Sequence, residues 1–241
     1  MILLFPWALT YASDHLVHLA ARACHAATVP LTLHLDHAQD AAQIRHAANI
    51  APGFDSIMID MSHHNKSENL ARTKALVEYC HARGIASEAE PGRFEGGEVG
   101  VADTAEAELE GLLTTAAEAG EFVATGIDWL APAFGNVHGA YGPRGIRLDY
   151  ERLRAIRAPV GGRVRLVLHG TDGFNEGIFR RCVEAGVVKV NVNKVVNRAY
   201  AEVCAEMSGK VGVTKVMEEG TERMRVVVER LMDQLGSSGK A

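Results

Sequence analysis

The chain has 241 residues, of which 47% are hydrophobic and 23% are charged, a balance that is typical of a globular protein and excludes a disordered chain. Its 25 basic and 30 acidic side chains leave a formal net charge of −5, so the composition gives no indication of binding to nucleic acid or an anionic membrane. Four well-separated cysteines without a CxxC pair are typical of reduced thiols. No apolar run approaches the roughly 20 residues of a membrane helix, and the N-terminus lacks the basic residues of a signal peptide. We therefore expect a cytoplasmic protein.

Short apolar runs of strand length alternate with helical patterns along the whole chain. The runs are Ile2–Phe5, Leu31–Leu35, Ser56–Asp60, Ile85–Glu90, Ile127–Ala133, Val164–His169 and Val187–Val192. The segments between them carry helix-start signals: Asn65 can cap a helix with Glu68 three residues later, and Thr115 with Glu118 repeats the arrangement. A terminal amphipathic helix is expected over about 212–235. No linker or repeat divides the chain, so one domain over residues 1–241 is predicted.

Alternation of strand and helix predicts parallel βαβ units, in either an open doubly wound sheet or a (β/α)8 TIM barrel. The first strand is not followed by GxGxxG, which weakens a dinucleotide-binding interpretation. A closed barrel has eight strands and only seven runs are visible. We therefore predict an α/β barrel that is incomplete at its N-terminus, without the first strand and helix.

Polar residues gather directly after the apolar runs. They include the segments His34–His37, Asp60–His64, Glu88–Glu90, Phe134–Gly139, His169–Gly173 and Lys189–Asn193. In a parallel barrel these strand ends share one face, where barrel enzymes carry out their chemistry. His37, His138 and His169 suit a zinc ion, because three imidazoles leave a fourth coordination position open. The alternative for each histidine alone is a bond to nearby backbone, and His34 is expected to be an interior histidine.

The sequence resembles the class II ketose-bisphosphate aldolases, which include the zinc-dependent fructose- and tagatose-bisphosphate enzymes. Six motifs occur in that family's order: LHLDHAQ (33–39), SIMIDMSHH (56–64), SEAEPGR…GGE (87–98), FGNVHGAYG (134–142), LVLHGTDG (166–173) and KVNVNK (189–194). The resemblance implies a TIM barrel that acts in carbohydrate metabolism such as glycolysis, as a homodimer or homotetramer.

The resemblance also implies roles for single residues. It implies that His37, His138 and His169 bind the catalytic Zn²⁺, and that Asp60 and Glu90 belong to a second divalent metal position. Asp36 would protonate the aldehyde oxygen, and Glu98 would act as the base on the triose phosphate. A phosphorylated sugar, with a monovalent cation beside its phosphate, would bind the residues Gly139, Gly170, Thr171, Asp172, Gly173, Asn191 and Asn193.

The phosphate loop differs from the family's usual His-Gly-(Gly/Ala)-Ser-Gly, because Thr171 and Asp172 stand in its middle. An ionised Asp172 would repel phosphate, so either it turns away or the substrate differs. Lys189 lies inside the last apolar run, and an outward-facing structural role is at least as good an interpretation of it as a role in the chemistry. The main hypothesis is a zinc-dependent aldehyde-lyase that works through the dihydroxyacetone phosphate enediolate. The alternatives are a non-catalytic aldolase-like zinc-binding protein and a zinc hydrolase on the same scaffold.

Overall fold

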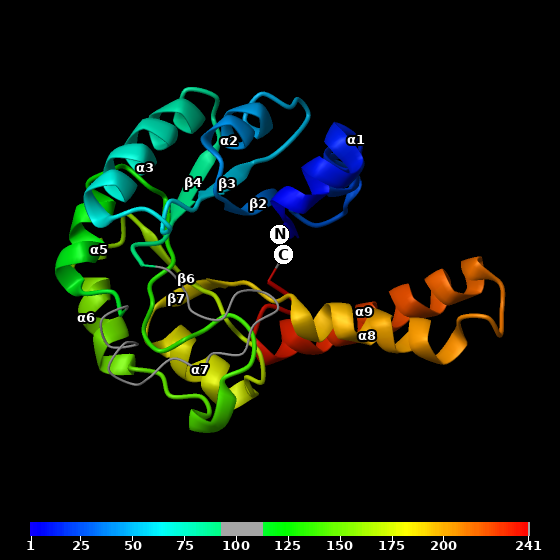
Figure 1. Cartoon of the computed structure of the whole chain (residues 1–241). Helices are drawn as coiled ribbons and strands as arrows, with labels where there is room; N and C mark the ends of the chain where they lie inside the picture. The colour runs from blue at the N-terminus through cyan, green and yellow to red at the C-terminus, as the bar shows by residue number, and fades with distance from the viewer. Residues whose placement is uncertain (93–112, 241) are drawn as a thin grey trace.

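The computed structural model describes residues 1–92 and 113–240. Within them, seven parallel strands form one sheet in the order of the sequence, β1 to β7. The strands are β1 (Ile2–Leu4), β2 (Leu33–Ala38), β3 (Ser56–Ile59), β4 (Ala86–Ala89), β5 (Trp129–Leu130), β6 (Arg165–Leu168) and β7 (Val187–Val190). The sheet curls into an open ring with β1 and β7 at its two edges (Figure 1). This confirms the predicted incomplete barrel, because each strand overlaps one of the apolar runs.

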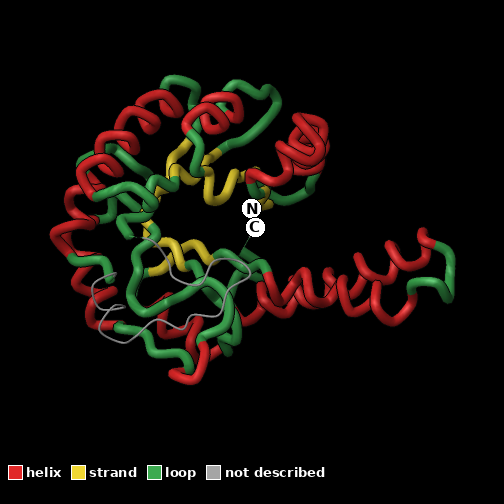
Figure 2. The backbone as a smooth tube through the Cα atoms, viewed as in Figure 1, coloured by secondary structure: helices red, strands yellow, loops and turns green. Residues whose placement is uncertain are grey.

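Helices cover the outside of the ring, as the red and yellow segments of Figure 2 show. They are α1 (Pro6–Ala26), α2 (Ala41–Ala47), α3 (Lys66–His81), α5 (Ala116–Val123), α6 (Tyr150–Val160), α7 (Glu176–Glu184), α8 (Lys194–Met207) and α9 (Val213–Gln234), with a 3-10 turn, η1 (Gly142–Arg144). The last two helices form a hairpin that projects from the ring (Figure 1). No helix within the described ranges is long and apolar enough to cross a membrane.

The predicted helix starts are confirmed. The Asn65 side chain accepts a hydrogen bond from the Glu68 backbone N–H at 3.0 Å and caps α3. Thr115 and Glu118 form a reciprocal capping box at the start of α5. In α9, the sequence pattern predicts one apolar stripe, but its members differ in burial, since Leu231 is buried and Met217 is 54% exposed. The predicted stripe consists of Met217, Met224, Val228, Leu231 and Leu235. The packed face contains Gly220, where a Cβ would lie 2.6 Å from the Tyr200 ring of α8.

The two faces of the curled sheet differ in chemistry. Side chains that point towards the helices, such as Leu35, Ile57 and Leu168, form the main apolar core. Alternate positions point into the ring, where Met58 and Val167 belong to a small second cluster. Many of the other inward side chains are polar and buried: His34, Asp36, Glu88, His169 and Asn191. Buried polar groups are costly unless they are paired, so the interior of the ring is the natural place to look for chemistry.

Candidate active site

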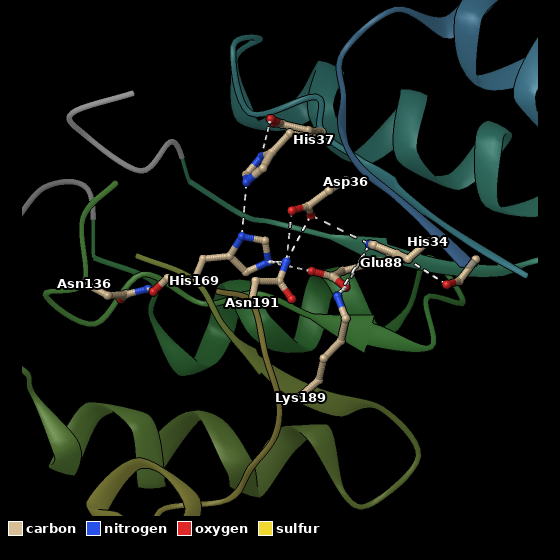
Figure 3. Close-up of polar contacts among 10 residues, drawn as sticks. His34, Asp36, His37, Glu88, Asn136, His169, Lys189 and Asn191 are labelled. Carbon is tan, nitrogen blue, oxygen red and sulfur yellow. Dashed lines mark hydrogen bonds and ion pairs between the residues drawn. The ribbon is translucent and has the colours of Figure 1, made fainter. Parts of the chain in front are cut away.

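Three histidines from distant parts of the chain meet at the carboxyl ends of the strands. His37 lies in β2, His138 follows β5, and His169 directly follows β6. One nitrogen from each ring lies within 4.8 Å of a nitrogen of each of the others. His37 Nε2 and His169 Nδ1 are 3.1 Å apart, and Figure 3 shows these two nitrogens pointing at each other. Tetrahedral zinc with Zn–N bonds of about 2.0–2.1 Å places its ligand nitrogens at roughly this separation.

A bulge in β2 explains how two neighbouring residues can both point into the site. In a regular strand Asp36 and His37 would face opposite sides of the sheet. The pairing with β3 shifts register between Leu35 and Ala38, and His37 has a positive φ of 48°. Such a conformation costs about 1–3 kcal/mol for a non-glycine residue. The bulge therefore turns the His37 ring towards the other histidines while Asp36 still faces the interior.

In two of the three imidazoles, the ring nitrogen that points away from the cluster donates a hydrogen bond to a carboxylate. His37 Nδ1 donates to Asp60 Oδ2 at 3.0 Å, so Nε2 faces the cluster. His169 Nε2 donates to Glu88 Oε1 at 2.8 Å, so Nδ1 faces the cluster. Both carboxylates are buried. A hydrogen bond on the far nitrogen fixes the tautomer and orientation of a metal-binding imidazole, and this arrangement recurs in zinc sites.

The pKa values of two histidines in the cluster are shifted in opposite directions. Burial would lower the pKa of His37, but the negative charge of Asp36 and the hydrogen bond to Asp60 outweigh it and raise that pKa to about 10. Burial and then the positive charges of His37 and His169 lower the pKa of His138 to about 3. His37 and His138 therefore do not both carry a positive charge near neutral pH. A divalent cation is the group that this crowded set of nitrogen donors suits.

A second group of potential metal ligands includes His37 and two buried carboxylates. Glu90 and Asp60 are both buried and together with His37 form another group whose donor atoms lie within 4.8 Å of one another. Burial, and then the negative charge of Asp60, raises the pKa of Glu90 well above its usual range. Glu90 Oε2 is buried without a hydrogen-bond partner in the described part of the chain. Paired carboxylates with an unused buried oxygen fit a cation.

Asp36 is held deep in the ring by Asn191. The Asn191 Nδ2 group lies 3.0 and 3.1 Å from the two Asp36 carboxylate oxygens, and 3.2 Å from His169 Nε2. Burial would raise the pKa of Asp36, but the positive charges of His37 and His169 hold it below its usual value. Asp36 is therefore an ionised carboxylate beside the cluster, in a position to accept a proton from a bound molecule.

The loops after the last two strands lie side by side. The Thr171 hydroxyl donates to the Asn191 carbonyl at 2.9 Å, so this hydroxyl proton is already used. Asp172 is 3.3 Å from the Lys194 ammonium, which neutralises its charge. Gly139 and Asn193 lie in the neighbouring segments at the same face of the ring. Loops after the last strands of a barrel are a usual phosphate site, and here the ion pair between Asp172 and Lys194 lies in these loops.

Comparison with known proteins agrees with this geometry. The profile of the family described as "Fructose-bisphosphate aldolase class-II" matches residues 1–240. The chain belongs to the class-II fructose-bisphosphate aldolase family. A Coccidioides immitis protein named "Putative fructose-bisphosphate aldolase" is 60% identical over all of this chain and 81% of the relative. A Geobacillus stearothermophilus protein named "Fructose-bisphosphate aldolase" is 37% identical over 89% of this chain and 73% of the relative.

Solved structures are similar over the whole chain. The crystal structure of the Coccidioides immitis aldolase-family protein superposes with a TM-score of 0.94 and covers 100% of this chain and 83% of that chain. The YdjI aldolase from Escherichia coli K12 gives a TM-score of 0.84 at 28% identity, with 100% of this chain and 83% of that chain covered. The metal dependence of the class-II family agrees with the histidine and carboxylate groups of this aldolase.

Lys189 of this class-II aldolase was not recognised from sequence as part of the site. Lys189 does not face outwards: its ammonium lies inside the ring, 2.6 Å from Glu88 Oε2. The signal was available, because Lys189 is two residues before Asn191 and so shares its face of the strand. The prediction for His34 is confirmed, because this histidine is fully buried in the interior and its Nδ1 lies 2.7 Å from Ser56 Oγ. Glu98 lies outside the described residues.

Proposed function

We propose that this class-II aldolase is a zinc-dependent aldehyde-lyase that cleaves or forms fructose- or tagatose-1,6-bisphosphate, with dihydroxyacetone phosphate as one fragment. The observation that carries the proposal is the convergence of three imidazoles at the carboxyl ends of the strands, two of them held by buried carboxylates. Family membership supplies the reaction class, since the relatives are named fructose-bisphosphate aldolases.

Each part of the site has a role in this proposal. His37, His138 and His169 would hold the zinc ion, and Asp60 and Glu90 would hold a second divalent ion. A bound zinc ion supplies a Lewis acid at the carbonyl end of the ketose. Thr171 and Asp172, with the glycines around them, would surround the phosphate of the ketose and its monovalent cation.

Asp36 would move the proton that cleavage requires. When the C3–C4 bond breaks, its electron pair stays on the three-carbon fragment as the enediolate of dihydroxyacetone phosphate, and the C4 hydroxyl loses its proton as the aldehyde forms. The ionised Asp36 accepts this proton and returns it to the aldehyde oxygen during condensation. Asn191 keeps both carboxylate oxygens in position for the transfer. General acid–base catalysis of this kind is typically worth about 10²–10⁴-fold.

The test is a coupled triose-phosphate assay on metal-stripped and zinc-reloaded protein, with fructose- and tagatose-1,6-bisphosphate as substrates. We expect activity that a chelator removes and zinc restores, and an Asp36→Asn variant that keeps zinc but loses about 10²–10⁴-fold of its activity. Asp233→Asn, at the exposed end of α9, is the control. Stoichiometric zinc without cleavage of either ketose would instead indicate a non-catalytic aldolase-like protein.

Two further features of the proposal have separate tests. We propose a homodimer or homotetramer, which light scattering after size-exclusion chromatography would distinguish from a monomer. We also propose a cytoplasmic role in carbohydrate metabolism, and cell fractionation would test the location. The relative rates on the two ketoses would decide between fructose and tagatose stereochemistry at C4.

A further inference from the structure

A buried group of charges lies inside the ring, next to the candidate metal cluster but outside the proposed chemistry. Lys189 Nζ is 2.6 Å from Glu88 Oε2 and 3.5 Å from His34 Nε2, and it lies 5.7 Å from the centre of the Trp129 ring. The Glu88 and His34 side chains are fully buried, and only 12% of the Lys189 side chain is exposed. Figure 3 shows the Lys189 ammonium pointing at the Glu88 carboxylate.

A buried ion pair between Lys189 and Glu88 is not needed to stabilise the fold. Taking an ammonium and a carboxylate out of water costs several kcal/mol each, and apolar side chains of the same size often stabilise a core at least as well. The other oxygen of Glu88 shows what the pair holds in place. Glu88 Oε1 accepts a hydrogen bond from His169 Nε2 at 2.8 Å, and the opposite nitrogen of that ring is 3.1 Å from His37 Nε2.

We propose that Lys189 is a positioning residue for the metal site. Its ammonium fixes the Glu88 carboxylate from β7 across the ring, and Glu88 in turn fixes the His169 ring so that Nδ1 presents its lone pair to the cation. The inference rests on the proposed function only in so far as the three histidines bind a metal. It assigns Lys189 no covalent role with substrate.

The side chains around the Lys189 ammonium explain why a positive charge is favourable at this position. His34, Asp36 and Glu88 offer donor atoms within 4.8 Å of one another, the spacing of a potential cation site. The Lys189 ammonium contacts two of its three members, Glu88 and His34. A cation on a side chain occupies this position permanently, so Glu88 remains oriented towards His169 whether or not the neighbouring cluster holds a metal.

The experiment measures zinc affinity by competition with a chelator in the full chain, together with the absorption spectrum of the cobalt-substituted protein. Lys189→Met removes the charge and keeps the length of the side chain. We expect about 10–100-fold weaker zinc binding, the usual effect of losing a group that orients a metal ligand, and altered cobalt bands. The matched control is Lys215→Met, whose ammonium pairs with Glu218 on the surface of α9 and which should bind zinc like the original protein.

A second variant keeps the test decisive if the first is poorly folded. Lys189→Ala leaves space for the missing ammonium, so propylammonium added to the solution should restore zinc affinity, while neutral propanol should not. Zinc affinity within twofold of the original protein in Lys189→Met, or no rescue of Lys189→Ala, would overturn the proposal. A borohydride-trapped adduct between Lys189 and dihydroxyacetone phosphate would also overturn it, by showing a covalent role. These readouts do not depend on ketose cleavage, so failure of the proposed function is scored separately.

Discussion

Gly170, in the loop that carries His169, packs against the backbone of the loop that carries His138. Its replacement by alanine tests whether the spacing of these two loops sets the zinc affinity. Gly170 has a φ of +68°, and a Cβ there would lie 2.3 Å from the Val137 carbonyl oxygen. Since real Cβ contacts are essentially never shorter than 3.0 Å, the two backbones would have to separate by at least 0.7 Å. Gly170 directly follows one histidine and Val137 directly precedes the other, so the separation falls on the metal cluster.

The magnitude follows from two terms. An alanine in the left-handed region costs about 1–2 kcal/mol wherever it occurs. Overpacking against fixed backbone adds about 1–3 kcal/mol. The control is Gly84→Ala, because Gly84 has a φ of +72° and no described atom within 4 Å of the added Cβ. We expect Gly84→Ala to lose about 1–2 kcal/mol and Gly170→Ala about 2–5 kcal/mol of unfolding free energy, measured by urea titration of the metal-free proteins.

Zinc affinity separates the two variants more clearly. Metal–ligand distances tolerate changes of only about 0.2 Å, so a shift of 0.7 Å or more between the histidine loops should weaken zinc binding at least about 10-fold. Gly84→Ala should bind zinc like the original protein, because it lies at the far end of α3. Equal zinc affinity in the two variants would refute the view that the contact between Gly170 and Val137 sets the spacing of the histidines.

Other predictions concern charge and thiol chemistry. Asp172→Asn should lower the KM for a ketose bisphosphate several-fold in steady-state assays, because it removes a negative charge and leaves the Lys194 ammonium for the phosphate; an unchanged or higher KM would place Asp172 away from the phosphate. At pH 8, a thiol reagent should label Cys204 of the native protein before Cys80 and Cys182, because burial raises the pKa of both buried thiols to about 11. The unfolded chain ionises these thiols at a lower pH than the folded chain. Urea titrations should therefore show the unfolding free energy falling as the pH rises from about 9 to 11, and a flat or rising profile would contradict the assignment.

Local sequence patterns predict many of the helices and strands. The capping pairs at Asn65 and Thr115 predict where α3 and α5 begin, because a short polar side chain followed by Glu three residues later satisfies backbone donors within one turn. The strands are predicted by short apolar runs that face the helices. The buried face of α9 is not, since the fit between Gly220 and the Tyr200 ring depends on a partner helix that a one-dimensional pattern does not contain.

The site was predictable in its residue types but not in its geometry. The positions of His37, His138 and His169 after strand ends are visible in the sequence, and parallel topology then directs them to one face. The bulge that turns His37 beside Asp36 is not visible, because strict alternation would separate the two residues. Nor does sequence separation show that Lys189 meets Glu88 across the ring, since that contact exists only when the sheet curls.

The most direct test of the account is the coordination shell of zinc in the reloaded protein, measured by X-ray absorption spectroscopy. We expect one zinc ion per chain with three imidazole nitrogens at about 2.0–2.1 Å, and the loss of one nitrogen in each of His37→Ala, His138→Ala and His169→Ala. A shell that contains cysteine sulfur, or one that none of the three substitutions changes, would contradict the claim that these histidines bind one ion.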